Sequence, residues 1–364
     1  MFQAALAAQG LPAARVIAWA EVVEAGAPTR WIGEVGGPAI VRIDSAGEDD
    51  AIDRRLIARG EAAARGVGCE VIAARDALAL PVARGQILYP RQHHLGFVAV
   101  LDELAAAFAA APQLYVPQPP AAVQLLFDKR ATSARWHAAG IPVPDPLPGG
   151  EVREPDDLRA RMDAVGWTSV FVKLTSGSSA SCLAVFVRRP SGEHVMTTIE
   201  DTGAARYNTR RIQRLNDRAR IDRTLRFILG EGAQVERAIP KARLAGRYFD
   251  CRVLVIDGEP AFVVARTATH PITNLNLGGQ RGDLSALRAA VPVAAWDAAM
   301  VSCRAVQRSS GAFHVGVDLM FEPGLARHRV IEGNAFGDLL PNLSRDGLDV
   351  YGWQIRRLLA AFRG

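Results

Sequence analysis

Lysine is the scarcest charged residue of this sequence. Of the 43 basic residues in the 364-residue chain, only Lys129, Lys173 and Lys241 are lysines, and the other 40 are arginines. Arginine is a planar fork whereas lysine is a compact point charge, and the two do not interchange at a tight phosphate site. The three lysines are therefore the first positions to examine for function.

Paired cysteines, long apolar runs and a signal segment are also missing. The four cysteines are far apart in the sequence and form no CxxC pair: Cys69, Cys182, Cys251 and Cys303. This spacing argues against a zinc site or a disulfide framework and suits a reducing compartment. No run reaches the roughly 18 apolar residues of a membrane span, and no charged start precedes an apolar stretch at the N-terminus. We expect a cytoplasmic protein that does not enter a membrane.

Charge is unevenly distributed in one place. The net charge of +5 is modest, but eight arginines fall between Arg206 and Arg226. Apolar residues recur there at roughly helical spacing, which predicts a helix with a solvated basic face. The alternative is a surface that attracts nucleic acid or an anionic substrate, and few interleaved aromatics make nucleic acid the minor option.

A proline-rich stretch at 112–120 separates two regions of different pattern. The length favours about two domains, with an α/β domain over residues 1–120. There we expect helices at 2–9, 49–60 and 97–110 and β segments at 14–19 and 38–43. Most nucleotide-binding α/β domains open on a buried strand, whereas this one opens on a helix. We therefore expect its first strand to be absent.

The rest of the chain predicts an α+β fold with antiparallel hairpins. Helices are expected at 123–139, 206–226, 296–307 and 350–362. Strands are expected at 168–173, 183–188, 233–239, 249–256, 260–266, 314–321 and 328–332. The Asp257-Gly258 pair is a strong hairpin turn signal.

Two lysines lie in contexts that suit phosphate binding. Lys173 ends a predicted strand and is followed by a small polar loop, Thr175-Ser176-Gly177-Ser178-Ser179. An ammonium group and loop N–H groups can hold phosphate together, although the spacing is not that of a P-loop. A purely structural turn is the alternative. Lys129 follows Asp128 at the start of a helix, where a surface lysine is the alternative.

Acidic residues within two apolar strands suggest a metal site. Asp318 lies on one predicted strand, and Glu332 and Asn334 end another. Residues two apart on a strand share a face, and unpaired carboxylates are costly to bury. Two carboxylates and an amide oxygen form a hard-oxygen set for Mg²⁺ held with substrate phosphates. Salt bridges to arginines are the alternative.

Basic strand residues precede this cluster. Arg252 in Asp250-Cys251-Arg252 and Arg266 can neutralise charge that develops during phosphoryl transfer, and the Asn274–Gly279 segment follows them. Each residue alone could be an ordinary ion-pair partner.

Taken in order, these motifs resemble the ATP-grasp superfamily of carboxylate–amine ligases, whose members include D-alanine–D-alanine ligase, glutathione synthetase and the ribosomal-protein glutamate ligase. The resemblance covers roughly residues 120–362. It rests on Phe127-Asp128-Lys129, Ile141-Pro142-Val143-Pro144, Phe171-Val172-Lys173, Val235-Glu236, Asp250-Cys251-Arg252, Arg266, Asn274–Gly279, Asp318 and Glu332-Gly333-Asn334. The first 120 residues resemble the preceding domain more loosely, with segments similar to an uncharacterised bacterial branch at 41–45 and 89–92.

The resemblance implies an ATP-grasp fold of two α+β subdomains, 121–234 and 235–364, that grip ATP behind the N-terminal domain. Nucleotide contacts are implied for Lys129, Lys173, Ser176, Gly177, Ser178 and Ser179, with Glu236, Arg237 and Ala238 as the hinge that reads adenine. Arg252 and Arg266 resemble the catalytic arginines near the γ-phosphate and the acyl-phosphate. Asp318, Glu332 and Asn334 match the ligands of two Mg²⁺ ions, for which Mn²⁺ can substitute.

Two departures from the family pattern stand out. The loop carries Ala180 and Cys182 where relatives carry glycines, which implies a stiffer loop. Residues 237–249 contain no acid to bind the ribose, so either Glu236 serves or the ribose is held differently. Lys241 lies in this stretch and is either a surface residue or part of the site.

The function these observations predict is ATP- and Mg²⁺-dependent joining of a carboxylate to an amine through an acyl-phosphate. The substrates would be small molecules or peptides, and the protein could form homo-oligomers. The alternatives are an ATP-binding regulatory or scaffold protein without turnover, and an ATP-grasp kinase acting on a small molecule.

Overall fold

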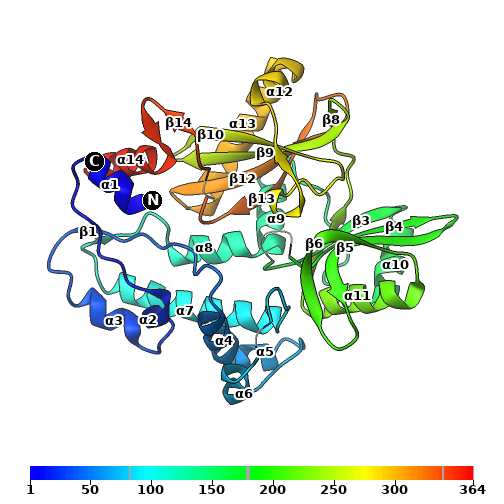
Figure 1. Ribbon diagram of the computed structural model, residues 1–364, viewed down its shortest axis with the longest axis horizontal. Coiled ribbons are helices and arrows are strands. Elements are labelled where there is room, and N and C mark those ends of the chain that lie inside the picture. Colours follow the sequence, from blue (N-terminus) through cyan, green and yellow to red (C-terminus); the bar gives the residue numbers. More distant parts are fainter. Residues whose placement is uncertain (82, 178–180, 338–339, 364) are drawn as a thin grey trace.

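The structure is a computed structural model that describes residues 1–81, 83–177, 181–337 and 340–363 (Figure 1). The first 119 residues are mainly helical, and their only strands among the described residues are β1 (Ala39–Ile40) and β2 (Leu114–Tyr115), which pair in parallel. The helices are α1 (Phe2–Ala8), α2 (Trp19–Val22), α3 (Ala27–Ile32), α4 (Asp50–Arg59), α5 (Glu61–Arg65), α6 (Ala74–Leu78) and α7 (Pro90–Ala109). The strand predicted at 14–19 is wrong, because this segment runs irregularly into α2.

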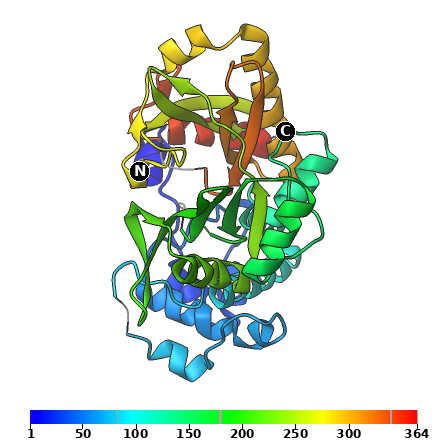
Figure 2. The ribbon, with the colours of Figure 1, turned by 90° about the vertical axis from the view of Figure 1, so that its right-hand side faces the viewer.

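Close backbone contact holds α4 against α7. A Cβ atom at Gly60 would lie 1.9 Å from the carbonyl oxygen of Gln92, and one at Gly96 would lie 1.8 Å from that of Leu56. Only glycine allows this approach. The Gln92 side chain lies in the same contact and donates to the carbonyls of Ile57 and Ile72. The two helices therefore pack tightly against each other in the lower part of the molecule (Figure 2).

A five-stranded antiparallel sheet follows, in the order β6-β5-β4-β3-β7. Its strands are β3 (Ser169–Leu174), β4 (Leu183–Arg189), β5 (Gly192–Asp201), β6 (Arg206–Leu215) and β7 (Ala233–Arg237). Helices α10 (Pro155–Ala164) and α11 (Arg218–Gly230) supply apolar residues such as Leu158 and Leu225 to the core on one face of the sheet. The strands predicted at 168–173, 183–188 and 233–239 are confirmed within a few residues.

The helix predicted across residues 206–226 is wrong in its first half. Residues 206–215 form the edge strand β6, and the helix begins only at Arg218. Asp217 caps that helix by accepting a hydrogen bond from the N–H of Arg220 at 2.9 Å. Such a cap marks a helix start and leaves the preceding residues free to pair as a strand. Pairing with β5, which periodicity within the segment does not reveal, decides the outcome.

A six-stranded sheet forms the other half of the protein, with β8 paired to β9 beside the path β11-β10-β9-β12-β13. Its strands are β8 (Arg243–Leu244), β9 (Arg247–Ile256), β10 (Glu259–Ala268), β11 (Gln280–Arg281), β12 (His314–Phe321) and β13 (His328–Asn334). The predicted hairpin at Asp257-Gly258 is confirmed. Both turn residues have positive φ, 48° and 76°, as tight hairpin turns require.

Two helices precede the five-stranded sheet in the chain. The single helix predicted at 123–139 is divided into α8 (Pro120–Phe127) and α9 (Lys129–Ala138). Asp128 makes the division, because its side chain accepts hydrogen bonds from the N–H groups of Arg130 and Ala131 and caps the second helix. Lys129 is therefore the first residue of a helix.

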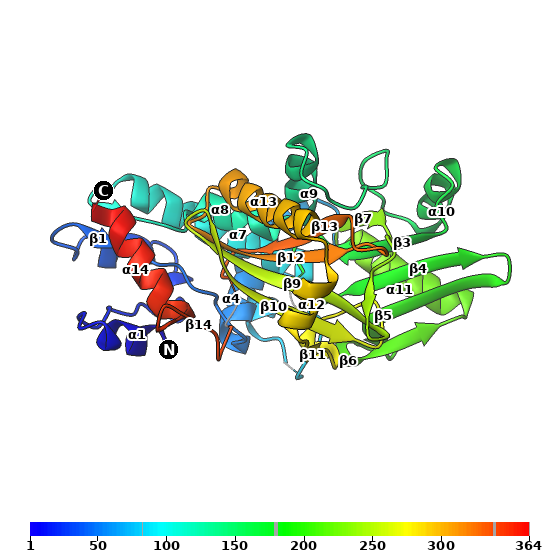
Figure 3. The ribbon, with the colours of Figure 1, turned by 90° about the horizontal axis from the view of Figure 1, so that it is seen from above.

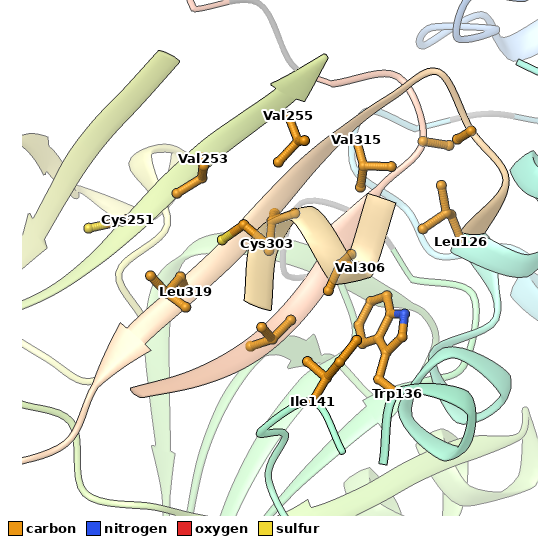
Figure 4. Packing of buried hydrophobic residues seen from close by; sticks show 14 of the residues in the cluster. Leu126, Trp136, Ile141, Cys251, Val253, Val255, Cys303, Val306, Val315 and Leu319 are labelled. Carbon is orange, nitrogen blue, oxygen red and sulfur yellow. The ribbon is translucent and has the colours of Figure 1, made fainter. Parts of the chain in front are cut away.

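The largest core joins the N-terminal helices to the six-stranded sheet. It contains Leu56 and Val100 from the helices and Val253 and Leu319 from the sheet. Figure 4 shows its centre, where Val253, Val255, Val315 and Leu319 lie beside Cys303 and Val306 of α13 (Val293–Ser310). The remaining elements are η1 (Leu275–Leu277), α12 (Leu284–Ala290), β14 (Ser344–Arg345), β15 (Leu348–Asp349) and α14 (Val350–Arg363).

Figures 1 and 3 show the green five-stranded sheet beside the yellow-to-orange six-stranded sheet. The predicted α+β class, with antiparallel hairpins, is confirmed. Among the described residues, no single helix is long and apolar enough to cross a membrane; only α12 and α13, bent by 117°, reach that composition as a pair.

Candidate functional site

A cleft between the two sheets collects most of the predicted site residues. It encloses about 930 Å³ of space, part of it open to solvent. Its lining includes all three lysines of the chain: Lys129 on α9, Lys173 on β3, and Lys241 in the segment between β7 and β8. The scarce lysines therefore converge on one place although they are scattered along the sequence.

Lys173 and Glu236 form the buried floor on the five-stranded sheet. They lie on the paired strands β3 and β7, and the Lys173 ammonium donates to Glu236 Oε1. Only 10% and 3% of the two side chains is exposed, so little water screens the pair. Lys173 Nζ also lies 5.3 Å from the ring centre of Phe171, which adds a cation–π contact. The pair fixes the direction of the Lys173 side chain.

Lys129 joins the small polar loop to the six-stranded sheet. Its N–H donates to Thr175 at 3.0 Å, and its ammonium donates to the Gly177 carbonyl. The same ammonium lies 3.3 Å from Glu332 Oε1 on β13. One lysine at the start of α9 thus touches both walls of the cleft.

A row of alternating charges crosses the six-stranded sheet. Asp318 on β12 lies opposite Arg252 on β9, and Arg266 on β10 lies opposite Asp250 on β9. Arg266 Nη2 is 3.1 Å from Asp318 Oδ1, and Arg252 Nη2 is 3.2 Å from Asp318 Oδ2. Burial acts to raise the pKa of Asp318, but the two arginines outweigh it and hold the pKa at about 2. Asp318 is thus an anion at any physiological pH.

Lys241 is the third lysine of the cleft, and its interpretation as a surface residue is wrong. Its ammonium is 3.3 Å from Asp250 Oδ2 and 2.7 Å from Thr273 Oγ1, with 8% of the side chain exposed. Burial lowers its pKa, and the Asp250 carboxylate opposes that shift. The sequence signal that could have identified it was its rarity.

A bulge brings two consecutive residues of β13 to the cleft. Asp318 pairs with Glu332 and Leu319 with Val330, so Ile331 is an extra residue between them. In a regular strand neighbours point to opposite faces, whereas here both Ile331 and Glu332 line the cleft. The bulge therefore places an apolar and an acidic side chain side by side.

Apolar side chains from both sheets line the cleft and form an apolar slot. The slot is lined by Phe171 and Leu183 from the five-stranded sheet and by Met320 and Ile331 from the six-stranded sheet. An apolar slot beside cationic groups can receive a flat ring that carries an anionic chain.

Two backbone N–H groups of the predicted hinge donate to carbonyl groups of neighbouring segments. The N–H of Arg237 donates to the Asp145 carbonyl at 2.9 Å, and that of Ala238 donates to Ser169 at 3.1 Å. Glu236 and Arg237 line the cleft, as does Ile239 beyond them, whereas Ala238 does not belong to the lining.

The predicted metal ligands lie on one face of neighbouring strands, but both carboxylates are held by cations. Asp318 is held by two arginines and Glu332 by Lys129, so both carboxylates form the salt bridges that were the alternative. The Asn334 amide donates to the Gly316 carbonyl at 3.1 Å. No group of three or more His, Cys, Asp or Glu side chains in the described part of the chain could hold a metal. Two carboxylates and one amide fit Mg²⁺ only together with phosphate oxygens and water.

The predicted residues divide into three groups. Those lining the cleft are Lys129, Lys173, Gly177, Glu236, Arg237, Arg266, Asp318 and Glu332. Those outside the lining are Ser176, Ala238, Arg252 and Asn334, although Arg252 binds Asp318 directly. Ser178 and Ser179 lie outside the described residues. The sequence did not identify Thr273 or the residues of the apolar slot as site residues, because ordinary apolar and hydroxyl side chains carry no local signal.

Cys182, the residue before β4, has a strained backbone conformation. Its φ of 49° lies in the left-handed region, which favours glycine. Its N–H donates to Asn208 Oδ1 at 3.2 Å, and burial raises the pKa of its thiol to about 12. The thiol is therefore not a nucleophile near neutral pH.

The sequence matches no protein-family model and no curated protein. Among solved structures, the chain is similar to the D-cycloserine synthetase DcsG, with a TM-score of 0.49, 15% identity, and 90% of this chain and 100% of that chain covered. It is also similar to the ATP-grasp ligase PsnB in complex with a precursor variant, Mg and ADP, with a TM-score of 0.48, 15% identity, and 90% and 80% covered. For D-alanine–D-alanine ligase from Bacillus anthracis the TM-score is 0.44, with 12% identity and 90% and 98% covered. Each of these three alignments covers 90% of this chain.

Proposed function

We propose that this protein is an ATP- and Mg²⁺-dependent ligase that joins a carboxylate to an amine. The observation that carries the proposal is the convergence of Lys129, Lys173 and Lys241 on one cleft beside an apolar slot. The slot would receive adenine, and the ammonium groups of Lys129 and Lys173 would receive phosphate oxygens. The three-part division at 1–120, 121–234 and 235–364 belongs to this proposal, although β7 crosses its second boundary.

Binding of a nucleotide would replace ion pairs that the lysines already form with carboxylates by contacts with phosphate. Lys173 is already paired with Glu236 and Lys129 with Glu332. A polyphosphate must therefore compete with two carboxylates for the same ammonium groups. The exchange frees Glu332, which together with Asp318 and Asn334 would hold Mg²⁺ against the phosphates. The bound ion would neutralise phosphate charge during transfer.

The chemistry follows from the weakness of a carboxylate as an electrophile. A substrate carboxylate oxygen attacks the γ-phosphorus of ATP, the bond to the β-phosphate oxygen breaks, and an acyl-phosphate and ADP form. The amine nitrogen then attacks the acyl carbon, inorganic phosphate leaves, and the nitrogen loses a proton. Arg266 and Arg252 would offset the negative charge that gathers on the transferred group.

Trapping with hydroxylamine tests this chemistry without knowledge of the amine. Protein, MgATP and a pool of carboxylic acids are incubated with hydroxylamine, which converts an acyl-phosphate into a hydroxamate detectable by mass spectrometry. We expect hydroxamate and ADP in equal amounts, lost in Glu332→Gln and retained in the exposed control Glu154→Gln. ATP binding with no ADP or AMP under any condition would instead indicate a regulatory protein. Phosphate transfer to a hydroxyl acceptor would indicate a kinase.

A further inference from the structure

The proposed ligase site does not account for the arginines of the edge strand β6. The arginine-rich segment 206–226 divides into two sets by the contacts its side chains make. In one set the guanidinium groups lie 3.1 to 4.0 Å from carboxylates: Arg206, Arg218, Arg223 and Arg226. By contrast, Arg210, Arg211 and Arg214 on β6, and Arg220 on α11, are exposed and form no ion pair with any described residue. The three arginines on β6 form the arginine strip.

An irregular stretch of β6 displays the strip. Thr197 pairs with Gln213 and Ile199 with Asn208, so four residues of β6 face a single residue of β5. The bulged stretch contains Arg210 and Arg211, and the N–H of Arg211 bonds to Thr209 Oγ1 at 3.0 Å. Bulges re-aim side chains and are frequent beside active sites. The side chains of these two arginines therefore do not follow the regular alternation between the two faces of the sheet.

Beyond the bulge, the position of Arg214 on β6 shows which face of the sheet it shares. Arg214 lies directly opposite Met196, and the two residues of such a pair share a face. Met196 and Ile212 pack in the cluster formed by Leu183, Ile272 and Leu277. Leu183 and Ile272 also line the cleft. Arg214 therefore lies on the same side of the five-stranded sheet as Leu183, and β6, which contacts η1, forms the edge of that sheet (Figure 3).

The backbone of β6 is covered on its outer side at one end. The N–H of Ile87 donates to the carbonyl of Arg206 at 2.8 Å. The N–H of Asn208 donates to the carbonyl of Gly85, also at 2.8 Å. These contacts end at residue 208. From residue 209 to 215, β6 makes no backbone bond on its outer side to any described residue. An edge of this kind can pair with an added extended chain.

From this combination we infer that the arginine strip is a docking surface for an acidic segment of a polypeptide. Three cations without carboxylate partners call for an anionic occupant, and an open strand edge suits an extended backbone. A chain bound along β6 would lead to the rim of the cleft, where a carboxylate is activated in the proposed reaction. The docking surface lies outside the cleft and can be tested without turnover.

Fluorescence anisotropy with labelled hexaglutamate, at low salt and with the whole protein, tests the inference. Replacing Arg210, Arg211 and Arg214 with Gln is expected to raise the hexaglutamate Kd roughly tenfold, since each exposed ion pair contributes modestly. Adding 0.5 M NaCl should weaken wild-type binding similarly. The matched control replaces Arg30, Arg75 and Arg356, three exposed arginines with local carboxylate partners, and should change Kd less than about twofold.

Three results would overturn the inference. The strip variant could bind hexaglutamate as tightly as the wild type, or the control could weaken binding equally, which would show a general charge effect. Labelled oligothymidine of equal charge could bind the strip more tightly than hexaglutamate, which would make the surface a nucleic-acid site. A thermal melt of each variant verifies that folding is unchanged. The ligase proposal stands or falls separately, on hydroxamate formation.

Discussion

Replacing Lys129 with Met should change nucleotide and metal affinity in opposite directions. The Lys129 ammonium contacts both Gly177 and Glu332, so it couples the polar loop to the predicted metal carboxylate. Methionine keeps the length and apolar stem of the side chain but removes its charge. The variant therefore loses a phosphate contact and at the same time releases Glu332.

The magnitudes follow from the contacts. A hydrogen bond to a charged group contributes about 1.5–3 kcal/mol, so the Kd for ADP should rise roughly 10- to 150-fold. The Lys129–Glu332 pair is partly exposed, with 11% and 24% of the side chains accessible. Without this pair, a metal ion no longer competes with the lysine for Glu332, which should improve its binding free energy by about 1 kcal/mol. In the absence of nucleotide, the affinity for Mn²⁺ should therefore rise roughly fivefold.

Calorimetry with ADP and electron paramagnetic resonance of free Mn²⁺ measure the two affinities separately. Lys129→Arg keeps the charge and serves as the control, with Mn²⁺ affinity close to that of the wild type. Mn²⁺ affinity that falls in Lys129→Met together with ADP affinity would refute the ion-pair exchange. It would show that Lys129 supports the metal site rather than competing with it.

Three further predictions concern stability. Lys241→Met should lower the free energy of unfolding by about 3 kcal/mol in urea titrations. The reason is that the buried carboxylate of Asp250 loses one of its cationic partners. Asp318→Asn should make the free energy of unfolding depend less on pH in the acid range. The pKa of Asp318 is about 2 in the folded protein against 3.8 ordinarily. Its contribution of about 2 kcal/mol to the free energy of unfolding is therefore present above pH 4 and is lost as the pH falls towards 2. Gly96→Ala should lower the melting temperature strongly, since the new Cβ would meet the backbone of α4, whereas Gly36→Ala, with nothing within 4 Å, should leave it unchanged.

Much of the secondary structure was predictable because its signals are local. The Asp257-Gly258 turn and the strands around it need only neighbouring residues. The failures at 14–19 and 206–215 have a different origin. In the second case the apolar spacing suits a helix, and pairing with β5 outweighs it. Such pairing is not visible within the segment itself.

The sequence by itself determined which residues could carry chemistry at this site. Three lysines among forty arginines, and two acids within apolar strands, are visible without coordinates. Only the tertiary structure decided how they combine: that Lys241 is buried against Asp250, and that Glu332 is held by Lys129. The physical reason is the separation along the sequence between the residues that interact. Turns and helix caps depend on a few consecutive residues, whereas these ion pairs exist only where two sheets bring distant segments within a few ångströms and exclude water.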